Sequence, residues 1–331
     1  MISSTASFQL LEAFLVRNGY TLTPLELRSG DNPFVTISST TRPGRLVINT
    51  KSPTYPFGTT SARRIFKDKH MAYAFVQSLG ITIPESKTVE SYSSDLDDFF
   101  GAYDRFIVKP VSAQGGKGLT LNITTKEQLE EAVNNATQFS PKVLVQRQFV
   151  GEEVRFTTID GVVTSALLRQ KPMVIGDGYS TVSQLIVAEN QSRRALTESV
   201  VTYPMLDEKL VKAELLHIQT VPAEGERVEL GLGTMIRNGA SMYNIIDSIH
   251  ASYIERIEKI ARTFGRGFAA IDMMIADVNA AATDDNYIFL EMNSDPALVL
   301  YYSCRDGKNI DIVEQHVGPL FLRALEGELR D

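Results

Sequence analysis

A glycine-rich loop with a lysine at each end is the first stretch of this sequence whose residue types suggest chemistry. It lies in RFIVKPVSAQGGKGLTLNI, where Lys109 ends an apolar run and Lys117 stands between glycines. Backbone amides of such a loop and nearby ammonium groups together favour bound phosphate. The stretch is not a P-loop, because Val111 stands where that motif requires its first glycine. It is not a dinucleotide fingerprint either, because an extended segment rather than a helix follows Gly118.

The residues of this loop fit two interpretations. Two antiparallel strands joined by a glycine-rich turn can form a flap over phosphates, with Lys117 in the flap and Lys109 reaching from the strand beneath. A flexible hairpin with a solvent-facing lysine fits the same residues equally well. The loop alone therefore does not decide between a phosphate site and a surface turn.

Three oxygen-bearing side chains near the end of the sequence form a second candidate group. Asp272 interrupts the apolar run FAAIDMMIA, and Glu291 and Asn293 lie two apart in NYIFLEMN. In a regular strand alternate residues share a face, so Tyr287, Phe289, Glu291 and Asn293 are expected together, with about 7 Å between the last two. Carboxylate and amide oxygens suit hard cations bound to phosphate. A solvated strand end is the simpler explanation for Glu291, but a buried Asp272 requires a metal ion or a basic partner.

Composition limits the other classes of function. The 331 residues are 43% hydrophobic and 22% charged, as in a soluble globular protein of two or three lobes. The formal charge of −7, with no basic block, argues against nucleic acid as a partner. The single cysteine permits no intrachain disulfide and suits a reducing cytoplasm. We expect no signal peptide and no membrane span, because no uncharged apolar stretch reaches about 20 residues.

Helical and extended patterns alternate along the sequence and predict an α+β protein. The expected helices are residues 8–17, residues 61–79, one capped by Thr124 with Glu127 completing a capping box, and IERIEKIARTFG. The expected strands are FVTIS, RLVIN, RFIVKP, GLTLNI, KVLVQRQFV, FAAIDMMIA and NYIFLEMN. Asp160 and Gly161 predict a type I′ hairpin turn. VIGDGYST is expected to be a tight turn before a helix capped by Thr181.

Six segments in order resemble the ATP-grasp superfamily, and within it the ligase part of cyanophycin synthetases and of bifunctional glutathione synthetases. They are KDKHMAYAFVQSLGITIPES, FIVKPVSAQGGKGLTLNI, GEEVRF, VIGDGYSTVSQLI, AAIDMM and FLEMNSDPAL, within about residues 60–302. The resemblance implies an ATP-grasp fold, in which two α+β lobes clamp ATP and a small lobe precedes them. The expected division is an N-terminal lobe at 1–60, a lid subdomain at 61–147, and a C-terminal subdomain with the metal site at 148–331.

The resemblance also implies ATP and two Mg²⁺ ions, with Mn²⁺ as a substitute, and assigns residues to them. The implied nucleotide-binding residues are Lys69, Lys109, Ser112, Gly115, Gly116, Lys117, Gly118, Gln146 and Glu153. The implied metal ligands are Asp272, Glu291 and Asn293. Arg155 and Arg169 match arginines near the phosphates and the acyl acceptor site. Arg237, in GTMIRNGAS, is either a further anion contact or a surface arginine.

The implied reaction joins a carboxylate to an amine: ATP phosphorylates the acid, and the amine displaces phosphate from the acyl phosphate. An amino acid or short peptide is the expected substrate, and a homo-oligomer is left open. A kinase of the same fold and a non-catalytic nucleotide-binding protein are the alternatives. Gln146 stands where glutamate is usual near the adenine, which implies looser base selectivity. Ala297, Tyr301 and Tyr302 depart from the pattern on the substrate side, where glycine and histidine are usual.

Overall fold

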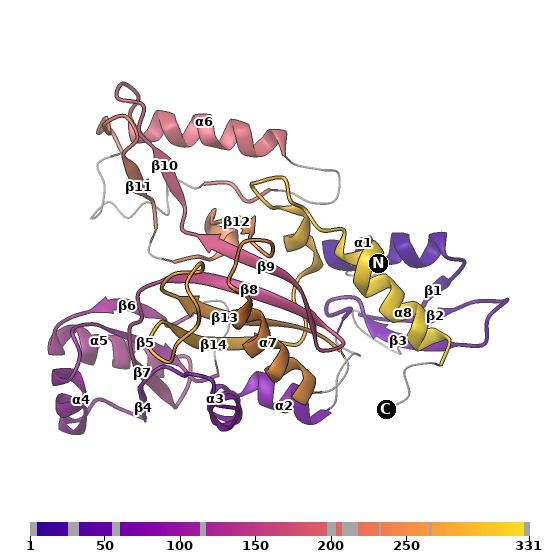
Figure 1. The fold of residues 1–331 in the computed structure, drawn as a ribbon, viewed down its shortest axis with the longest axis horizontal. Helices are drawn as coiled ribbons and strands as arrows, with labels where there is room; N and C mark the ends of the chain where they lie inside the picture. Colours follow the sequence, from indigo (N-terminus) through magenta and orange to yellow (C-terminus); the bar gives the residue numbers. More distant parts are fainter. Residues whose placement is uncertain are drawn as a thin grey trace.

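The fold is a large antiparallel sheet with a smaller lobe at each end and an arm above it (Figure 1). The computed structural model describes residues 5–25, 33–54, 60–112, 117–196, 203–206, 218–231, 233–264 and 267–327. The predicted α+β class is confirmed. Among the helices in these ranges, none is both long and apolar enough to cross a lipid bilayer.

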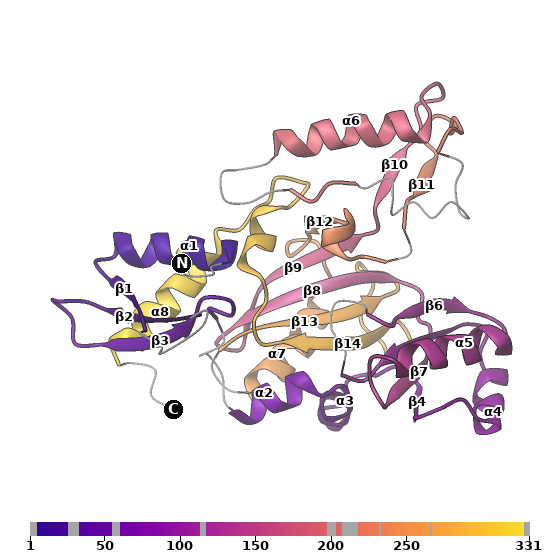
Figure 2. The same ribbon diagram turned by 180° about the vertical axis from the view of Figure 1, so that it is seen from behind.

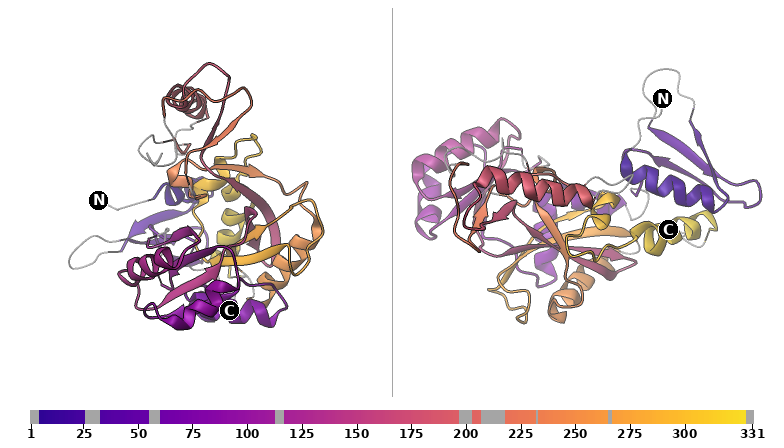
Figure 3. Two further views of the ribbon diagram at one scale, coloured as in Figure 1. Left: turned by 90° about the vertical axis from the view of Figure 1, so that its left-hand side faces the viewer. Right: turned by 90° about the horizontal axis from the view of Figure 1, so that it is seen from above.

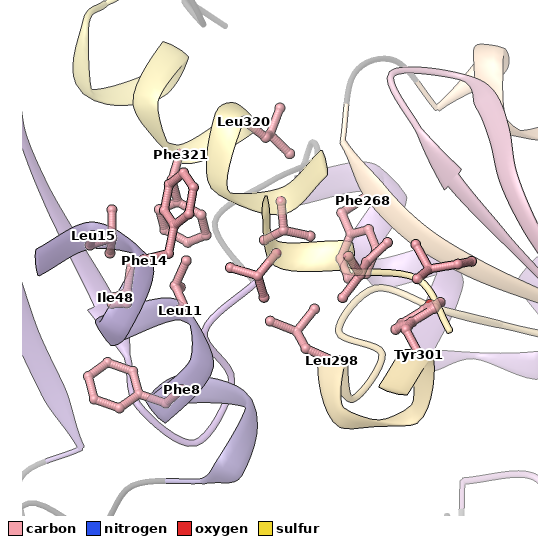
Figure 4. Packing of buried hydrophobic residues seen from close by; sticks show 14 of the residues in the cluster. Phe8, Leu11, Phe14, Leu15, Ile48, Phe268, Leu298, Tyr301, Leu320 and Phe321 are labelled. Atoms are coloured by element: carbon pink, nitrogen blue, oxygen red, sulfur yellow. The ribbon is translucent and has the colours of Figure 1, made fainter. Parts of the chain in front are cut away.

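The N-terminal lobe is a three-stranded antiparallel sheet packed against two helices from opposite ends of the sequence. Its elements are α1 (Ala6–Arg17), β1 (Thr21–Pro24), β2 (Phe34–Ser38), β3 (Arg45–Asn49) and α8 (Gly318–Leu325). Figure 4 shows Phe14 and Leu15 of α1 facing Phe321 of α8. The same core continues through Leu298, in the 3-10 turn η4 (Leu298–Tyr302), to the large sheet. A π-helical turn, η5 (Val313–Val317), leads into α8.

A small four-stranded sheet forms the lobe at the other end of the molecule (Figure 3). Its order is β4-β7-β5-β6, and α5 covers one face. The elements are β4 (Ser86–Val89), η1 (Ser94–Leu96), α4 (Asp97–Gly101), β5 (Phe106–Pro110), β6 (Thr120–Ile123), α5 (Lys126–Thr137) and β7 (Val143–Arg147). Because side chains alternate, Lys109 of β5 and Gln146 of β7 lie on the face away from α5.

Two local helix predictions were wrong. The capping box of α5 uses Thr125 and Gln128, not Thr124 and Glu127, because the Gln128 amide oxygen accepts from the Thr125 backbone at 3.2 Å. The single helix expected at 61–79 is two, α2 (Thr60–Lys67) and α3 (Lys69–Ser78). The carboxylate of Asp68 breaks it by accepting from the first backbone amides of α3, as an N-cap does.

The large sheet has the order β12-β9-β8-β13-β14 and is antiparallel throughout. Its strands are β8 (Glu152–Ile159), β9 (Val162–Gln170), β12 (Ser241–Asn244), β13 (Phe268–Ile275) and β14 (Tyr287–Asn293). Both α3 and α7 (Ala251–Thr263) pack into the core on one face. The predicted I′ turn between β8 and β9 is confirmed, with φ of 51° at Asp160 and 83° at Gly161.

A β-bulge in β14 changes which of its side chains share a face. Asp272 lies opposite Glu291, but Met273 lies opposite Phe289, so Leu290 is an extra residue. Tyr287 and Phe289 therefore point into the α7 core, whereas Glu291 lies on the other face with Asp272. The expected common face for all four alternate residues is wrong, because simple alternation does not survive a bulge.

The arm lies beyond β9 and projects above the large sheet (Figures 1 and 2). It consists of β10 (Met173–Ile175), α6 (Val182–Ala195) and β11 (Arg227–Glu229). The predicted cap is confirmed, because Thr181 forms a capping box with Gln184. The predicted turn before it is also confirmed: the Asp177 carboxylate accepts from the backbone amides of Tyr179 and Ser180.

Candidate active site

A buried ion pair lies at the centre of the large sheet. Arg155 of β8 is directly opposite Asp272 of β13, and its Nε and Nη2 donate to the two carboxylate oxygens at 2.7 and 2.6 Å. Both side chains are at least nine-tenths buried, so Asp272 has the basic partner that its burial requires. Burial alone would raise the pKa of Asp272, but the charges of Arg155 and Arg169 lower it overall.

A second ion pair lies next to the first, on the side of the arm, and the two pairs form a charged row across the large sheet. Arg169 of β9 donates from Nη1 to Glu153 Oε1 at 2.6 Å, and the same nitrogen lies 4.0 Å from Asp272 Oδ2. Thr234 donates its hydroxyl to the other Glu153 oxygen. Burial raises the pKa of Glu153, and the nearby Asp272 adds to the rise, although Arg169 opposes it. Thr234 was not predicted, because this contact joins segments 81 residues apart.

The other two predicted metal ligands complete the row at β14. Glu291 lies opposite Asp272, and Asn293 donates from Nδ2 to Glu291 Oε1 at 3.2 Å. Within the described ranges, no three His, Cys, Asp or Glu side chains gather closely enough to hold a metal ion. The predicted ligands differ from such a group, because Asp272 and Glu291 are carboxylates but Asn293 is an amide.

The two predicted phosphate-binding lysines approach β14 from the small sheet and α3. Lys109 Nζ donates to the Tyr73 hydroxyl at 3.2 Å, and Lys69 Nζ donates to the Val111 carbonyl at 3.4 Å. The pKa of Lys69 is lowered by burial and by the charge of Lys109, whereas the charge of Glu291 opposes this. The structure thus brings Lys69 and Lys109 close to Glu291, which is far from both of them in the sequence.

Gln146 lies beside the lysines and is almost fully buried, with 1% of its surface exposed. Its Nε2 donates to the Tyr73 hydroxyl at 3.1 Å, while its Oε1 has no hydrogen-bond partner in the described part of the protein. The Tyr73 hydroxyl in turn lies 3.4 Å from the carbonyl of Leu290, the bulge residue. Tyr73 was not predicted, although it stands one helical turn after Lys69 in α3 and so shares its face.

The glycine-rich loop is described only at its ends. Ser112 is exposed and donates to Ser140 Oγ at 3.2 Å, and Lys117 is exposed. Gly118 has φ of +69°, and a Cβ there would lie 2.7 Å from the Phe139 ring and 2.8 Å from Pro110 Cγ, so this position needs glycine. Gly115 and Gly116 lie outside the described residues. So does the side chain of Arg237, whose backbone lies in the 3-10 turn η3 (Ile236–Asn238).

Comparison with known proteins gives this arrangement a context. The cyanophycin synthetase of Trichormus variabilis is 26% identical over 248 residues, 72% of this chain and 27% of the relative. The glutathione biosynthesis bifunctional protein GshAB of Streptococcus agalactiae is 24% identical over 269 residues, 78% of this chain and 34% of the relative. The chain thus spans about a third or less of these curated relatives. No protein-family model matches it.

The solved structures decide the fold. The crystal structure of a bifunctional glutathione synthetase from Pasteurella multocida superposes with a TM-score of 0.66 at 20% identity, covering 99% of this chain and 45% of that one. The chain has the ATP-grasp fold. The fold expected from the six sequence segments is therefore confirmed. In this fold the lysines, Gln146 and the charged row meet around β14, where the small sheet faces the large one.

One of the substrate-side departures, Tyr301, also has a defined location in this fold. Tyr301 is fully buried, and its hydroxyl lies 2.7 Å from Oγ1 of Thr157, which follows Arg155 by two residues in β8. Burial raises the pKa of Tyr301 to about 12, so it is neutral at ordinary pH. Cys304 is buried too, and burial raises its pKa to about 12, which disfavours a reactive thiolate.

Proposed function

We propose that this chain is an ATP-dependent carboxylate–amine ligase that forms an amide or peptide bond through an acyl phosphate. The observation that carries the proposal is the meeting at β14 of two lysines with the row of acids and arginines across the large sheet. Phosphoryl transfer to a carboxylate needs positioning and charge neutralisation rather than a protein nucleophile. The relatives named above are synthetases, which favours amide formation over phosphorylation of a hydroxyl.

The described residues fit ATP. The buried Gln146 Oε1, which has no partner among the described residues, is an acceptor of the kind that an adenine amine requires. Lys69 and Lys109 supply positive charge for the α- and β-phosphates, and Lys117 supplies it from the flap. We assign Glu153 to the ribose hydroxyls, which places the nucleotide between the small and large sheets.

The described residues also fit Mg²⁺. Glu291, Asn293 and Asp272 offer only oxygen donors, which hard cations prefer. Arg155 takes one lone pair from each Asp272 oxygen, and a carboxylate has about four such sites, so the acid keeps capacity for a cation. Bound Mg²⁺ would supply charge neutralisation on the transferred phosphoryl group. We propose two ions, as the resemblance implies.

The arginines of the charged row are suited to an acyl phosphate. Arg169 is held by Glu153 and lies near Asp272, and its buried Nε has no hydrogen-bond partner within the described residues. It can therefore donate to a further oxyanion without leaving its ion pair. We assign Arg155 to orienting Asp272 and stabilising the same developing charge, and Arg237 to a carboxylate of the substrate.

We infer that the acid or the amine is an amino acid or a short peptide, and that the reaction takes place in the cytoplasm. The division into a small lobe at 1–60, a lid at 61–147 and a metal-bearing part at 148–331 belongs to the same proposal. The separate core of the small sheet supports a lid that moves as a unit.

The test is product analysis with magnesium, ATP and pooled amino acids and dipeptides. We expect ADP and phosphate in equal amounts, formed only when an acid and an amine are both present. Formation of AMP and pyrophosphate would exclude the acyl phosphate route. A stable phosphorylated alcohol would instead identify a kinase.

A further inference from the structure

The hydroxyl group of Tyr73, in α3, contacts three strands of the candidate nucleotide site. It contacts Lys109 Nζ at 3.2 Å, Gln146 Nε2 at 3.1 Å and the Leu290 carbonyl at 3.4 Å. Tyr73 itself is buried in α3, and its ring packs edge-on against Phe289. One hydroxyl therefore links α3 and both sheets at the bulge of β14.

The hydrogen-bonding capacity of this hydroxyl fixes how the Gln146 amide is turned. A tyrosine hydroxyl has one proton to donate and accepts through its oxygen. The carbonyl of Leu290 can only accept, so it takes the proton, and the ammonium of Lys109 can only donate. The hydroxyl therefore offers Gln146 an acceptor, which is satisfied by the amide nitrogen. The amide oxygen is left on the other side, buried, with no partner within the described residues.

This orientation determines what kind of base edge the glutamine can recognise. Gln146 with its oxygen presented accepts from an exocyclic amine, as adenine has at position 6. Hypoxanthine and guanine carry a carbonyl there, so two acceptors would face each other. A free glutamine could turn its amide by 180° and bind either edge, whereas a glutamate could not donate to a carbonyl.

We propose that Tyr73 is the positioning residue that gives this site its selectivity for adenine, by holding the Gln146 amide in one orientation. The inference rests on the proposed binding of ATP but not on the ligase reaction. Tyr73 touches neither the base nor the reacting atoms in this arrangement; it acts through Gln146.

Replacing Tyr73 by phenylalanine should loosen base selectivity rather than abolish binding. Phe keeps the ring packing but removes the acceptor for Gln146 Nε2, so the amide can turn. The turned oxygen would face the space of the lost hydroxyl, where Lys109 can donate to it. Loss of the Lys109 contact affects the phosphates, which every purine nucleoside triphosphate shares. The ratio of affinities therefore isolates the effect on the base.

The experiment measures the Kd of ATP and of inosine triphosphate, which differs from ATP by a carbonyl at position 6 and a proton on N1. Two acceptors that face each other without a donor between them lower the affinity roughly 5- to 100-fold. The wild type should therefore prefer ATP over inosine triphosphate by such a factor. In Tyr73→Phe the preference should fall to about threefold or less, through tighter binding of inosine triphosphate. Tyr253→Phe is the matched control, because Tyr253 is also buried but its hydroxyl donates to the Asp277 carbonyl. It should keep the wild-type ratio.

A second background tests the role of the amide directly. In Gln146→Glu both carboxylate oxygens accept, so no rotation can change the recognised edge. Adding Tyr73→Phe to Gln146→Glu should therefore leave the ratio of affinities unchanged. The proposal is overturned if Tyr73→Phe alone keeps the wild-type ratio, or if it lowers the ratio equally in the glutamate background. Failure of the wild type to bind any nucleotide would instead refute the proposed function.

Discussion

Replacing Asp272 by asparagine should destabilise the protein even without magnesium, because Arg155 would lose the charge that balances it. The two side chains are only 2% and 10% exposed, and their two hydrogen bonds measure 2.6 and 2.7 Å. A hydrogen bond to a charged group is worth roughly 1.5–3 kcal/mol. Asparagine keeps one acceptor oxygen, so one such bond and the charge are lost. We expect the free energy of unfolding to fall by about 3 kcal/mol, the lower end for a broken buried pair.

The assay is urea unfolding in magnesium-free buffer, followed by circular dichroism. Asp97→Asn is the matched control, because the pair of Asp97 with Lys126 has an N···O distance of 2.8 Å but is exposed, and its loss should hardly move the midpoint. Adding Arg155→Met to Asp272→Asn should restore part of the stability by removing the unbalanced cation, without restoring activity. If Asp272→Asn unfolds like the wild type, the pair does not stabilise the sheet and our account of its low pKa is wrong.

Three further predictions concern the site. Glu291→Gln should slow turnover, and more magnesium should partly rescue it. Lys109→Ala should instead weaken ATP binding by about 1.5–3 kcal/mol, through the lost phosphate contact, and more magnesium should not rescue it. Steady-state kinetics at varied magnesium would contradict this if both variants responded alike. Gly118→Ala should lower stability by about 1–3 kcal/mol, because its Cβ would strike Phe139 at a positive φ, and an unchanged melting temperature would refute the clash. The pKa of Asp272 is lowered in the folded protein, so its contribution to stability is complete above the unfolded pKa of about 3.9 and is lost as pH falls through the folded pKa. The difference in unfolding free energy between wild type and Asp272→Asn should therefore shrink below about pH 4. A constant difference in acid would contradict this prediction.

Features that depend on neighbouring residues could be predicted from the sequence. The I′ turn at Asp160 and Gly161 and the helix cap at Thr181 follow from side chains within a few residues of each other. The break at Asp68 was also local, but an acid inside a helical pattern is more often a surface residue than a cap.

Features that depend on pairing between strands could not be predicted in this way. The bulge at Leu290 exists only in relation to the register of β13, and it decides which face carries Glu291. The partner of Asp272 is 117 residues away, so the sequence required a counter-charge without identifying Arg155. The role of Tyr73 depends on hydrogen-bond partners from three elements, Lys109, Gln146 and Leu290, and none of them is near Tyr73 in the sequence.

The shared core of α1 and α8 has a consequence for the order in which the protein becomes stable during synthesis. Leu15 and Phe14 of α1 pack against Phe321, so the N-terminal lobe lacks part of its core until α8, far downstream of α1, has been made. At about 5–20 residues per second, ribosomes need on the order of 15–60 s to cover that interval. The apolar face of α1 is exposed to other proteins throughout that time, while the four-stranded sheet, whose last strand ends at Arg147, can already assemble. The lobe that contains α1 is thus completed only after α8 has been made, and until then the nascent chain is more open to chaperones and to aggregation.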